Sequence, residues 1–517
     1  MVKRFFKRLL GLVIGLLLLV GLWLVGGVWW PLAVPQPNAQ LAQLLLEDVE
    51  LIDVESGLLW SGQDILIEAG HIVAVGPDLQ APGAKRIAGD GLFAIPGLFD
   101  MHMHSTRMAP LLTHPLFIAN GVTAVRDMGG CIGIEDAFIA CADDKREWNR
   151  AVAAGEMVGP RYDQVTSLAI NGGREIPTGV DPALGAGTAT GARQRVALDS
   201  KRGVDFLKTY TMLPREGFQV LAEEAPAAGM YLAGHLPLEV SAREAIAAGQ
   251  RSIEHAFLFI WDCYPDMDDL RQVPDPRQLF TNELRKAMIA GHDAGLCSQL
   301  HRQMSTSGTA FVPTHTTRKL DAYATNEAFR TDARLRYIPD PLRRLWLSDA
   351  DGMARRAGAG GQQSYMDFYR FGIRQTGIAH RAGVTVLAGS DAPDSFAFPG
   401  SAIHDELDHL VEAGLSPIEA LRSATLEPAR FLDLDGQAGV IRPGARADIV
   451  LLRKNPLQDI GAVREIETVI LAGTVYARED LETLLAGVES AAGSWAMWPR
   501  FTWQILNSPI MKKQFGD

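Results

Sequence analysis

Short runs that alternate apolar and polar residues fill two distant parts of the chain, residues 46–94 and residues 436–480. Residues 64–68 in the first part and 447–452 in the second are examples, and turn residues separate the runs. Alternation with a period of two indicates antiparallel strands. We therefore expect both parts to form one small flanking β-sandwich domain, built from both ends of the catalytic region.

The centre of the chain, residues 95–435, has a different pattern, in which short apolar strands alternate with longer stretches of helical period. Eight strand candidates lie near residues 92–102, 122–128, 163–170, 204–210, 230–235, 251–255, 309–314 and 384–390. Such alternation is typical of βα units around a parallel sheet, and eight units make a TIM barrel. The pattern predicts an α/β fold, a (β/α)₈ TIM barrel, whose two long late connections carry substrate contacts.

The first 30 residues form a segment of their own. Four basic residues, Lys3, Arg4, Lys7 and Arg8, precede an uncharged run from Leu9 to Trp30. As a helix at about 1.5 Å per residue this run spans roughly 33 Å, enough to cross a bilayer. We expect an uncleaved, single-pass transmembrane anchor in membrane lipid, with a linker at 31–45 and the catalytic body on the periplasmic or extracytoplasmic side.

The alternative for this segment is a cleaved signal peptide. Signal peptides usually have a shorter apolar region followed by a small-x-small cleavage site. Here the run ends in Trp29-Trp30-Pro31, and no Ala-x-Ala follows it closely. The sequence therefore favours the anchor.

Composition narrows the class of protein. Hydrophobic residues make up 47% of the 517 residues and charged residues 21%, as in ordinary globular proteins. The formal net charge of -12 argues against nucleic acid as a partner, because phosphate neutralisation needs clustered Lys and Arg.

The chain has four cysteines: Cys131, Cys141, Cys263 and Cys297. They lack the paired spacing of a structural zinc site, and their even number is compatible with disulfides in an oxidising compartment. Cys131 with Cys141 is then the favoured pair. Four buried thiols are the alternative.

Candidate metal ligands recur where predicted strands end. His102 and His104 end the first strand two residues apart, so both share one strand face. Ligand-type residues also end the fourth, fifth, sixth and eighth strands, in the order Lys208, His235, His255 and Asp391. Catalysis in barrels is built at these strand ends, so recurrence at one level is hard to explain by packing.

These positions resemble those of the amidohydrolase superfamily, which carries His-x-His after strand one, lysine after strand four, histidines after strands five and six, and aspartate after strand eight. The barrel entry at 95–104 and the exit at 413–425 and 439–450 also resemble that family. Gly234-His-Leu-Pro and Ile253-Glu-His look most like the imidazolonepropionase-related group, which contains prolidase-like Xaa-Pro and Xaa-Arg dipeptidases. The resemblance extends from residue 46 to residue 476.

The resemblance implies a binuclear site for divalent ions, most simply Zn²⁺. His102, His104 and Asp391 would hold one ion, His235 and His255 the other, and Lys208 both, as a CO₂-derived carbamate. A lysine ammonium has no lone pair for a metal, so a functional Lys208 must become neutral or carboxylated. The alternative is a single-metal, deaminase-like enzyme in which Lys208 is incidental.

The implied reaction is hydrolysis of a small peptide-like or cyclic amide by a hydroxide that bridges the two ions, with Asp391 as general base and then general acid. An esterase or lactonase would use the same attack. A non-catalytic binding protein on this fold is a further alternative, although all six ligand positions are filled.

Three further residues are candidate substrate contacts. Tyr210 lies two residues beyond Lys208 and resembles a dipeptidase position that meets the substrate carboxylate. His315 ends the seventh strand, and Arg174 lies in the loop after the third. Packing at the rim is the alternative for Tyr210, and a simple surface position for the other two.

The tail, residues 481–517, is rich in aromatic residues: Trp495, Trp498, Phe501 and Trp503, followed by Lys512 and Lys513. Aromatics at this density suit an amphipathic helix at a membrane interface. Packing onto the barrel exterior is the alternative. His404 and His409, on a helical stretch after strand eight, are interpreted as structural.

Overall fold

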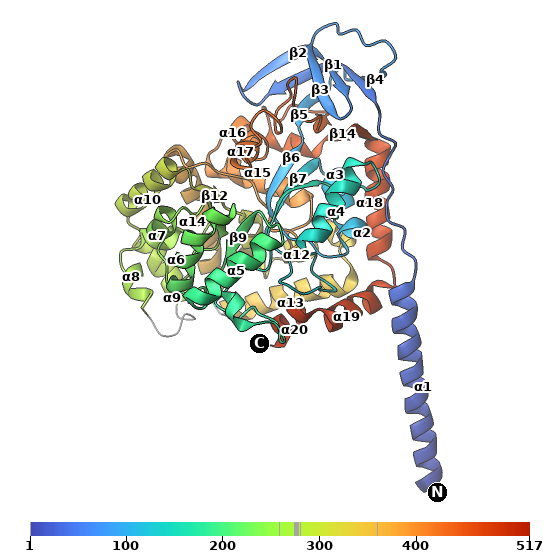
Figure 1. Cartoon of the computed structure of the whole chain (residues 1–517), viewed down its shortest axis with the longest axis vertical. Coiled ribbons are helices and arrows are strands. Elements are labelled where there is room, and N and C mark those ends of the chain that lie inside the picture. Colours follow the sequence, from blue (N-terminus) through green and yellow to red (C-terminus); the bar gives the residue numbers. More distant parts are fainter. Residues whose placement is uncertain (1, 258, 273–278, 280, 359, 517) are drawn as a thin grey trace.

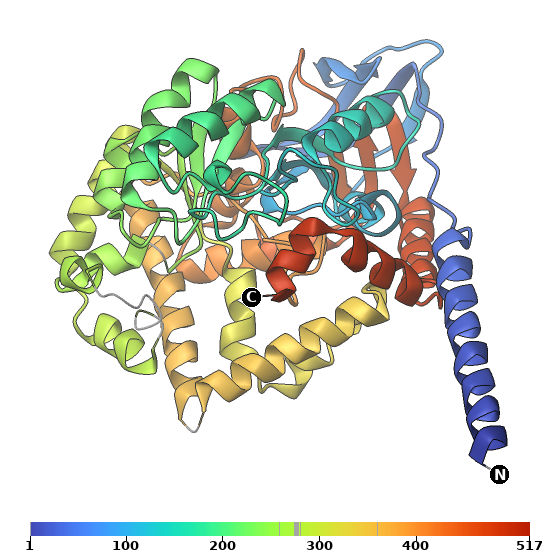
Figure 2. The same cartoon turned by 60° about the horizontal axis from the view of Figure 1, so that its bottom comes forward.

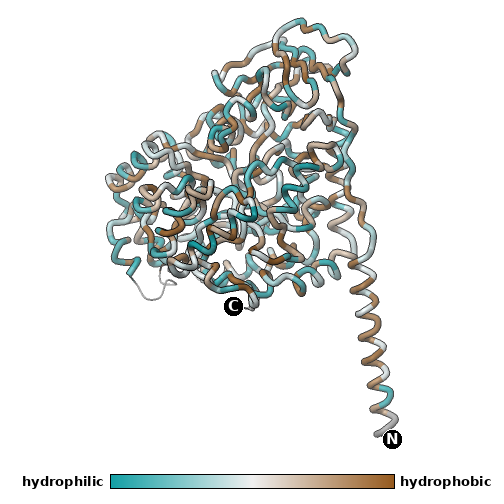
Figure 3. Tube along the Cα trace, in the orientation of Figure 1, coloured by the Kyte–Doolittle hydropathy of each residue, from teal (hydrophilic) through white to brown (hydrophobic). Residues whose placement is uncertain are grey.

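The computed structural model describes residues 2–257, 259–272, 279, 281–358 and 360–516, without the side chains of residues 2–4 and 515–516. The side chains of Lys3 and Arg4, two of the four basic residues expected to flank the anchor, therefore lie outside the description. Helix α1 (Val2–Trp29) projects from the body, and most of its residues are apolar, apart from a hydrophilic stretch near the N-terminus (Figures 1 and 3). Phe5–Trp29 is long and apolar enough to cross a membrane, which is also true of many signal sequences.

The two alternating parts of the sequence join in one sheet. Its strands are β1 (Gln43–Asp53), β2 (Leu58–Glu68), β3 (His71–Gly76), β4 (Lys85–Ala88), β5 (Phe93–Pro96), β13 (Ile449–Leu452), β14 (Ile466–Leu471) and β15 (Thr474–Ala477). The order is β15-β14-β13-β5-β1-β2-β3, with β4 beside β1. The antiparallel pair β5–β13 joins the strands of the first part to those of the second. Hydrogen bonds thus connect these eight strands in one continuous sheet, where the expected sandwich implied two.

The centre of the molecule is a ring of parallel segments. Its strands are β6 (Leu98–Met103), β7 (Val122–Asp127), β8 (Arg161–Val165), β9 (Phe206–Thr209), β10 (Tyr231–Gly234), β11 (Ser252–Glu254) and β12 (Ala310–Val312). All neighbouring pairs are parallel. Between β8 and β9, Asp205 N donates to Val165 O at 2.9 Å, and Ile170 bridges Thr209.

The segment around Val386 closes the ring. Phe311 on β12 bridges Val386, and Met101 N on β6 donates to Ala388 O at 2.9 Å. The expected eighth strand at 384–390 is reduced to an isolated bridge at Val386, and the amides of Ser390 and Asp391 both donate to the carbonyl of His102. The residue that ends the eighth segment is thereby held against the residue that ends the first.

Helices surround the ring: α2 (Ala109–Leu112), α3 (His114–Ala119), α4 (Ala142–Ala153), α5 (Ala189–Lys201), α6 (Arg215–Glu224), α7 (Ala242–Ala247), α8 (Met267–Leu270), α9 (Asn282–Ala290), α10 (Ala294–Ser307), α11 (His315–Tyr323), α12 (Glu327–Arg330), α13 (Asp340–Ala357), α14 (Gly361–Arg381), α15 (Ser401–Ala413), α16 (Pro417–Ser423) and α17 (Leu426–Phe431). On α15, Ile403, Leu407 and Leu410 share one buried face, the spacing of an amphipathic helix. The two long late connections are thus helical, α8–α10 and α11–α14.

The tail forms α18 (Arg478–Ala492), α19 (Met497–Asn507) and α20 (Pro509–Gly516). Helix α19 lies between α1 and α13, at the end of the body from which α1 projects (Figures 1 and 2). Phe501 is buried, whereas Trp495, Trp498 and Trp503 are exposed. One face of the tail therefore packs on the body, and aromatic residues cover another.

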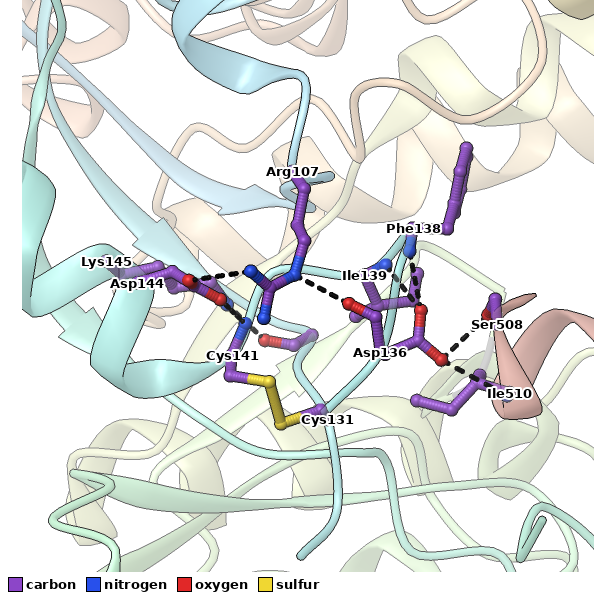
Figure 4. Close-up of a disulfide and its surroundings, with 11 residues drawn as sticks. Arg107, Cys131, Asp136, Phe138, Ile139, Cys141, Asp144, Lys145, Ser508 and Ile510 are labelled. Carbon is purple, nitrogen blue, oxygen red and sulfur yellow. Dashed lines mark hydrogen bonds and ion pairs between the residues drawn. A yellow bond between two sulfur atoms is a disulfide. The ribbon is translucent and has the colours of Figure 1, made fainter. Parts of the chain in front are cut away.

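All four cysteines are paired, as Cys131–Cys141 and Cys263–Cys297. The first disulfide, Cys131–Cys141, is the pair favoured from the sequence. It closes the loop between β7 and α4 (Figure 4).

Candidate metal centre and its cavity

The six ligand-type residues expected from the strand ends lie together at one end of the ring. Asp391 Oδ1 is 3.0 Å from His104 Nε2 and 3.3 Å from His102 Nε2. Lys208 Nζ is 3.4 Å from His102 Nε2. Ligand atoms of His102, His255 and Asp391 all lie within 4.8 Å of one another, close enough to hold one ion.

His235 completes this group from β10. Its ring centre is 4.6 Å from that of His255, which is in turn 4.9 Å from that of His102. Because parallel strands end at the same side of a ring, side chains separated by more than a hundred residues meet there. These six residues, His102, His104, Lys208, His235, His255 and Asp391, are called the metal-ligand cluster below.

Hydrogen bonds behind the cluster orient three of its histidines. Nδ1 of His102 lies 2.8 Å from a Glu254 carboxylate oxygen. Nδ1 of His255 lies 2.7 Å from the hydroxyl of Thr314, and Nδ1 of His235 lies 3.0 Å from that of Thr211. Such partners fix ring orientation and leave Nε2 free to bind, as is usual for histidine ligands of metals.

A buried ion pair that the sequence analysis missed supports His102. Glu254, on β11, accepts a hydrogen bond from Arg126 Nη2 at 2.8 Å, and both side chains are fully buried. Arg126 also donates to the carbonyl of Met101 beside the cluster. The sequence signal that could have revealed this pair is a charged residue within an otherwise buried strand, Arg126 in β7 and Glu254 in β11.

Burial shifts the protonation of the cluster. It lowers the pKa of Lys208, against the opposing charge of Asp391, and holds the pKa values of His235 and His255 well below their ordinary range. Burial raises the pKa of Asp391, but His102, His104 and His255 together outweigh it, so the net shift is strongly downward. Neutral amine and imidazole groups beside an ionised carboxylate are the forms that offer lone pairs to a metal.

Two cluster residues have left-handed backbone conformations, His255 with φ 70° and Asp391 with φ 60°. A non-glycine residue rarely adopts such angles, and those that do concentrate at functional sites. Both occur where a parallel segment turns away from the ring. The turn directs each side chain toward the cluster.

A cavity of about 730 Å³ opens over the cluster. It is lined by five cluster residues, all but His102, and by Tyr210 and Arg174. The ring of Tyr210 stacks on that of His235, with centres 4.1 Å apart. Tyr210 and Arg174 therefore both lie where a substrate would meet them.

Arg318, on α11, is a further cavity residue that the sequence did not single out. Its Nη1 is 2.8 Å from Asp321, and its guanidinium lies 4.9 Å from the Phe257 ring centre. No motif marks it, because α11 reaches the cavity through a long connection whose path the sequence does not give.

His315 lies elsewhere than the sequence predicted. Thr314 has φ 46°, and the chain turns there into α11, so the ring of His315 is buried 3.0 Å from the hydroxyl of Thr376. It lines a small separate cavity and does not line the large one. His404 and His409 are buried on α15.

Much of the rest of the cavity lining is apolar and comes from distant segments. It includes Met108, Phe138, Ile338, Leu342, Phe501 and Met511, and this part of the lining is called the apolar chamber below. Met108, Phe138, Leu342 and Phe501 pack in one hydrophobic cluster. Phe501 belongs to α19 and Met511 to α20, so the tail forms part of the cavity wall.

A parallel ring with ligand-type side chains converging at one end is the arrangement of an α/β enzyme that works at its strand ends. The sequence model of the amidohydrolase family matches residues 369–476. Ochratoxinase of Aspergillus niger is 23% identical over 438 residues, which cover 72% of this chain and 73% of that protein.

Solved structures share the fold. A bottromycin amidohydrolase superposes with a TM-score of 0.66 at 21% identity, over 87% of this chain and 91% of the other. A Xaa-Pro dipeptidase with bound methionine superposes with a TM-score of 0.58 at 21% identity, over 84% of this chain and all of the other. The family model and the curated relative bear out the sequence-based identification of the amidohydrolase superfamily and of an enzyme acting on carbon–nitrogen bonds.

Proposed function

We propose that this protein is a metal-dependent amidohydrolase that cleaves an amide bond in a small peptide-like or cyclic substrate. The observation that carries the proposal is the convergence of the metal-ligand cluster on the floor of one cavity. Fold alone would not support it, because many chemistries share this fold.

The donor set fits two divalent ions such as Zn²⁺. His102, His104 and Asp391 would hold one ion, His235 and His255 the second, and Lys208 both as a carbamate. Imidazole nitrogens and carboxylate oxygens are ordinary zinc ligands. The Lys208 amine lies 3.4 Å from His102 Nε2 and 3.5 Å from His104 Nε2. A protonated Lys208 at this place would repel a metal ion bound by these histidines.

When bound, such ions lower the pKa of water toward neutrality and polarise a carbonyl. The chain itself would supply the proton transfers. Asp391 accepts the proton of the attacking water, whose oxygen bonds to the carbonyl carbon. As the carbon–nitrogen bond breaks, Asp391 returns that proton to the leaving nitrogen.

Tyr210, Arg174 and Arg318 would orient the substrate from the cavity wall. The Xaa-Pro dipeptidase with methionine bound in its active site supports a small, dipeptide-like substrate with a carboxylate for these residues to meet. Arginine and the tyrosine hydroxyl both donate hydrogen bonds that a carboxylate accepts. His315 has no place in this proposal, because it does not line the cavity.

The proposal extends to the architecture. The ring and its helices, residues 95–435, would be the (β/α)₈ TIM barrel, residues 46–94 and 436–480 the composite β-domain, and residues 481–517 the tail. Residues 1–30 would anchor the protein in the membrane with its body on the extracytoplasmic side, followed by the linker at 31–45. Two disulfides agree with an oxidising compartment.

The test is metal content per chain together with hydrolysis, measured on the full chain purified in detergent without chelator. We expect about two ions per chain, fewer in Lys208→Ala, and an unchanged content in Lys201→Ala, an exposed lysine on α5. Dipeptides and cyclic amides should be hydrolysed, chelator should stop the reaction, and added Zn²⁺ should restore it. One ion per chain, unaffected by Lys208→Ala, would favour the single-metal alternative. No hydrolysis of any amide by metal-loaded protein would refute the proposal.

A further inference from the structure

The cavity offers more room than the metal-ligand cluster needs. Its volume of about 730 Å³ lies within the range of pockets that enclose whole drug-sized molecules, roughly 300–1,000 Å³. The cluster forms one part of its lining, and the apolar chamber, whose side chains pack with one another, forms another. A substrate that filled only the cluster end would leave the chamber to water.

The walls of the chamber are fixed in place by polar contacts outside it. The buried carboxylate of Asp136 accepts hydrogen bonds from the hydroxyl of Ser508 at 2.7 Å and the amide of Ile510 at 3.3 Å, which ties the start of α20 to the loop before α4 (Figure 4). The same carboxylate accepts the amides of Phe138 and Ile139 at 2.8 Å each.

Two further contacts hold the loop that carries Phe138. Arg107 Nε donates to the carbonyl of Asp136 at 2.6 Å, and the disulfide Cys131–Cys141 closes the loop (Figure 4). The chamber is therefore pre-formed, and a ligand pays little to order it. Removing apolar surface from water in such a site gives about 25 cal/mol per Å² buried.

We infer that the substrate is an amide that carries an extended apolar group on one side of the scissile bond, and that this group lies in the apolar chamber while the amide meets the metal-ligand cluster. The inference rests on the proposed function for the bond that is cleaved. It adds the class of substrate, an amphiphilic amide, to that proposal.

The position of the chamber suits such a compound. Helix α19 lines it with Phe501 and contacts the apolar helix α1, where Arg500 Nε donates to the carbonyl of Gly27 at 3.3 Å. The rings of Trp30 and Trp495 lie 5.4 Å apart beside this contact. An amphiphile could reach the chamber from solution or from a bilayer at this end of the molecule.

The first test compares two series of amides on the full chain in detergent. One series is N-acyl amino acids with acetyl, hexanoyl, decanoyl and tetradecanoyl groups. The other is N-alkylacetamides with alkyl groups of matching length. In one of the two, kcat/KM should rise about 2- to 4-fold per methylene until the chamber is full. Values that are flat or falling in both series would overturn the inference.

Variants locate the effect. Leu342→Trp fills the chamber from α13 and should abolish the gain with length, while metal content stays as in the native protein. Ser348→Trp places the same bulk on an exposed position of the same helix and should leave the gain unchanged. Asp136→Ala, which frees the tail, should weaken it. A length preference that survives Leu342→Trp would place the apolar group elsewhere and overturn the inference.

Binding separates this inference from the proposed function. Asp391→Asn, which removes the proposed base, should bind the ten-carbon member of at least one of the two series at least about 10-fold more tightly than its shortest member in calorimetry, as several buried methylenes require. If no amide is hydrolysed but this preference is seen, the proposed function fails and the chamber assignment stands. Equal affinities within both series would overturn the assignment even if short amides are cleaved. Substrate supplied in phosphatidylcholine vesicles or as monomers then distinguishes a bilayer source from a dissolved one.

Discussion

The two ends of the cavity are built in different ways. At the metal end, six side chains project from five segments of one ring, and strand hydrogen bonds set their spacing. At the apolar end, segments near residues 108, 138, 342, 501 and 511 meet without sharing a sheet. The ring thus sets the chemistry, while the size and polarity of the substrate depend on segments that can change without disturbing it.

The largest expected effect removes the proposed base at the metal end. Asp391→Asn should lower kcat by at least about 10³-fold, because the residue is asked to supply both proton transfer and metal binding. Asparagine tolerates the left-handed backbone that Asp391 adopts, so the fold should be kept. Steady-state kinetics with circular dichroism measures both.

Asp394→Asn is the matched control. Asp394 also lines the cavity, three residues further along, but is not a member of the metal-ligand cluster. We expect less than about a 10-fold loss from it. Comparable losses in the two variants would show that any carboxylate in this wall matters, and would remove the special role of Asp391.

The second prediction concerns the apolar end. The double variant Cys131→Ser and Cys141→Ser should lower the free energy of unfolding by about 3 kcal/mol, as expected for a loop of this length. It should also weaken the preference for long apolar groups, since the loop carries Phe138. Metal content should not change. Chemical denaturation and the amide series measure these effects.

The other disulfide provides the comparison. Removing Cys263–Cys297 in the same way should cost about 4 kcal/mol, because it spans more of the chain. Neither cysteine lines the cavity, so the length preference should be kept. If both double variants change that preference equally, general loosening of the fold explains it.

The sequence predicted the two ends unequally, for a physical reason. Ligand-type residues recur at the ends of five of the predicted strands, and parallel strands bring such ends together. The apolar chamber has no such pattern, because it depends on contacts like that between Asp136 and Ser508, which are 372 residues apart. Thr211 and Thr314, the hydrogen-bond partners of His235 and His255, likewise follow no pattern in the sequence.

Local backbone turns set another limit. His315 follows a predicted strand just as His255 does, yet Thr314 turns the chain into α11 and buries His315 against Thr376. The predicted eighth strand at 384–390 likewise forms only an isolated bridge at Val386, and Asp391 after it has a left-handed backbone. Strand periodicity gives the order of residues but not the turn that follows them.

The third prediction tests the support behind the metal end. Thr314→Val removes the hydroxyl 2.7 Å from His255 Nδ1 while keeping a β-branched shape. Loss of such a partner typically costs about 10- to 100-fold in metal affinity. Titration of the chelated protein with Zn²⁺ measures it. Thr376→Val, which removes the same kind of partner from His315 outside the cavity, should leave zinc affinity unchanged. Equal effects of both changes would argue that the hydroxyls stabilise the fold and do not orient a ligand.

The smallest effect is expected at Arg318, which lines the cavity without belonging to the metal-ligand cluster or the apolar chamber. Arg318→Lys keeps the charge but loses the planar pair of donors that suits a carboxylate. KM for substrates with a free carboxylate should rise about 10-fold, the value of one lost charge-assisted hydrogen bond, with kcat little changed. The corresponding carboxamides should be unaffected. Arg330→Lys, at an ion pair with Asp351 outside the cavity, is the control and should change neither value. A fall in kcat for the carboxylates and the carboxamides alike would instead place Arg318 at the reacting bond. The reacting bond would then lie closer to the apolar chamber than we propose.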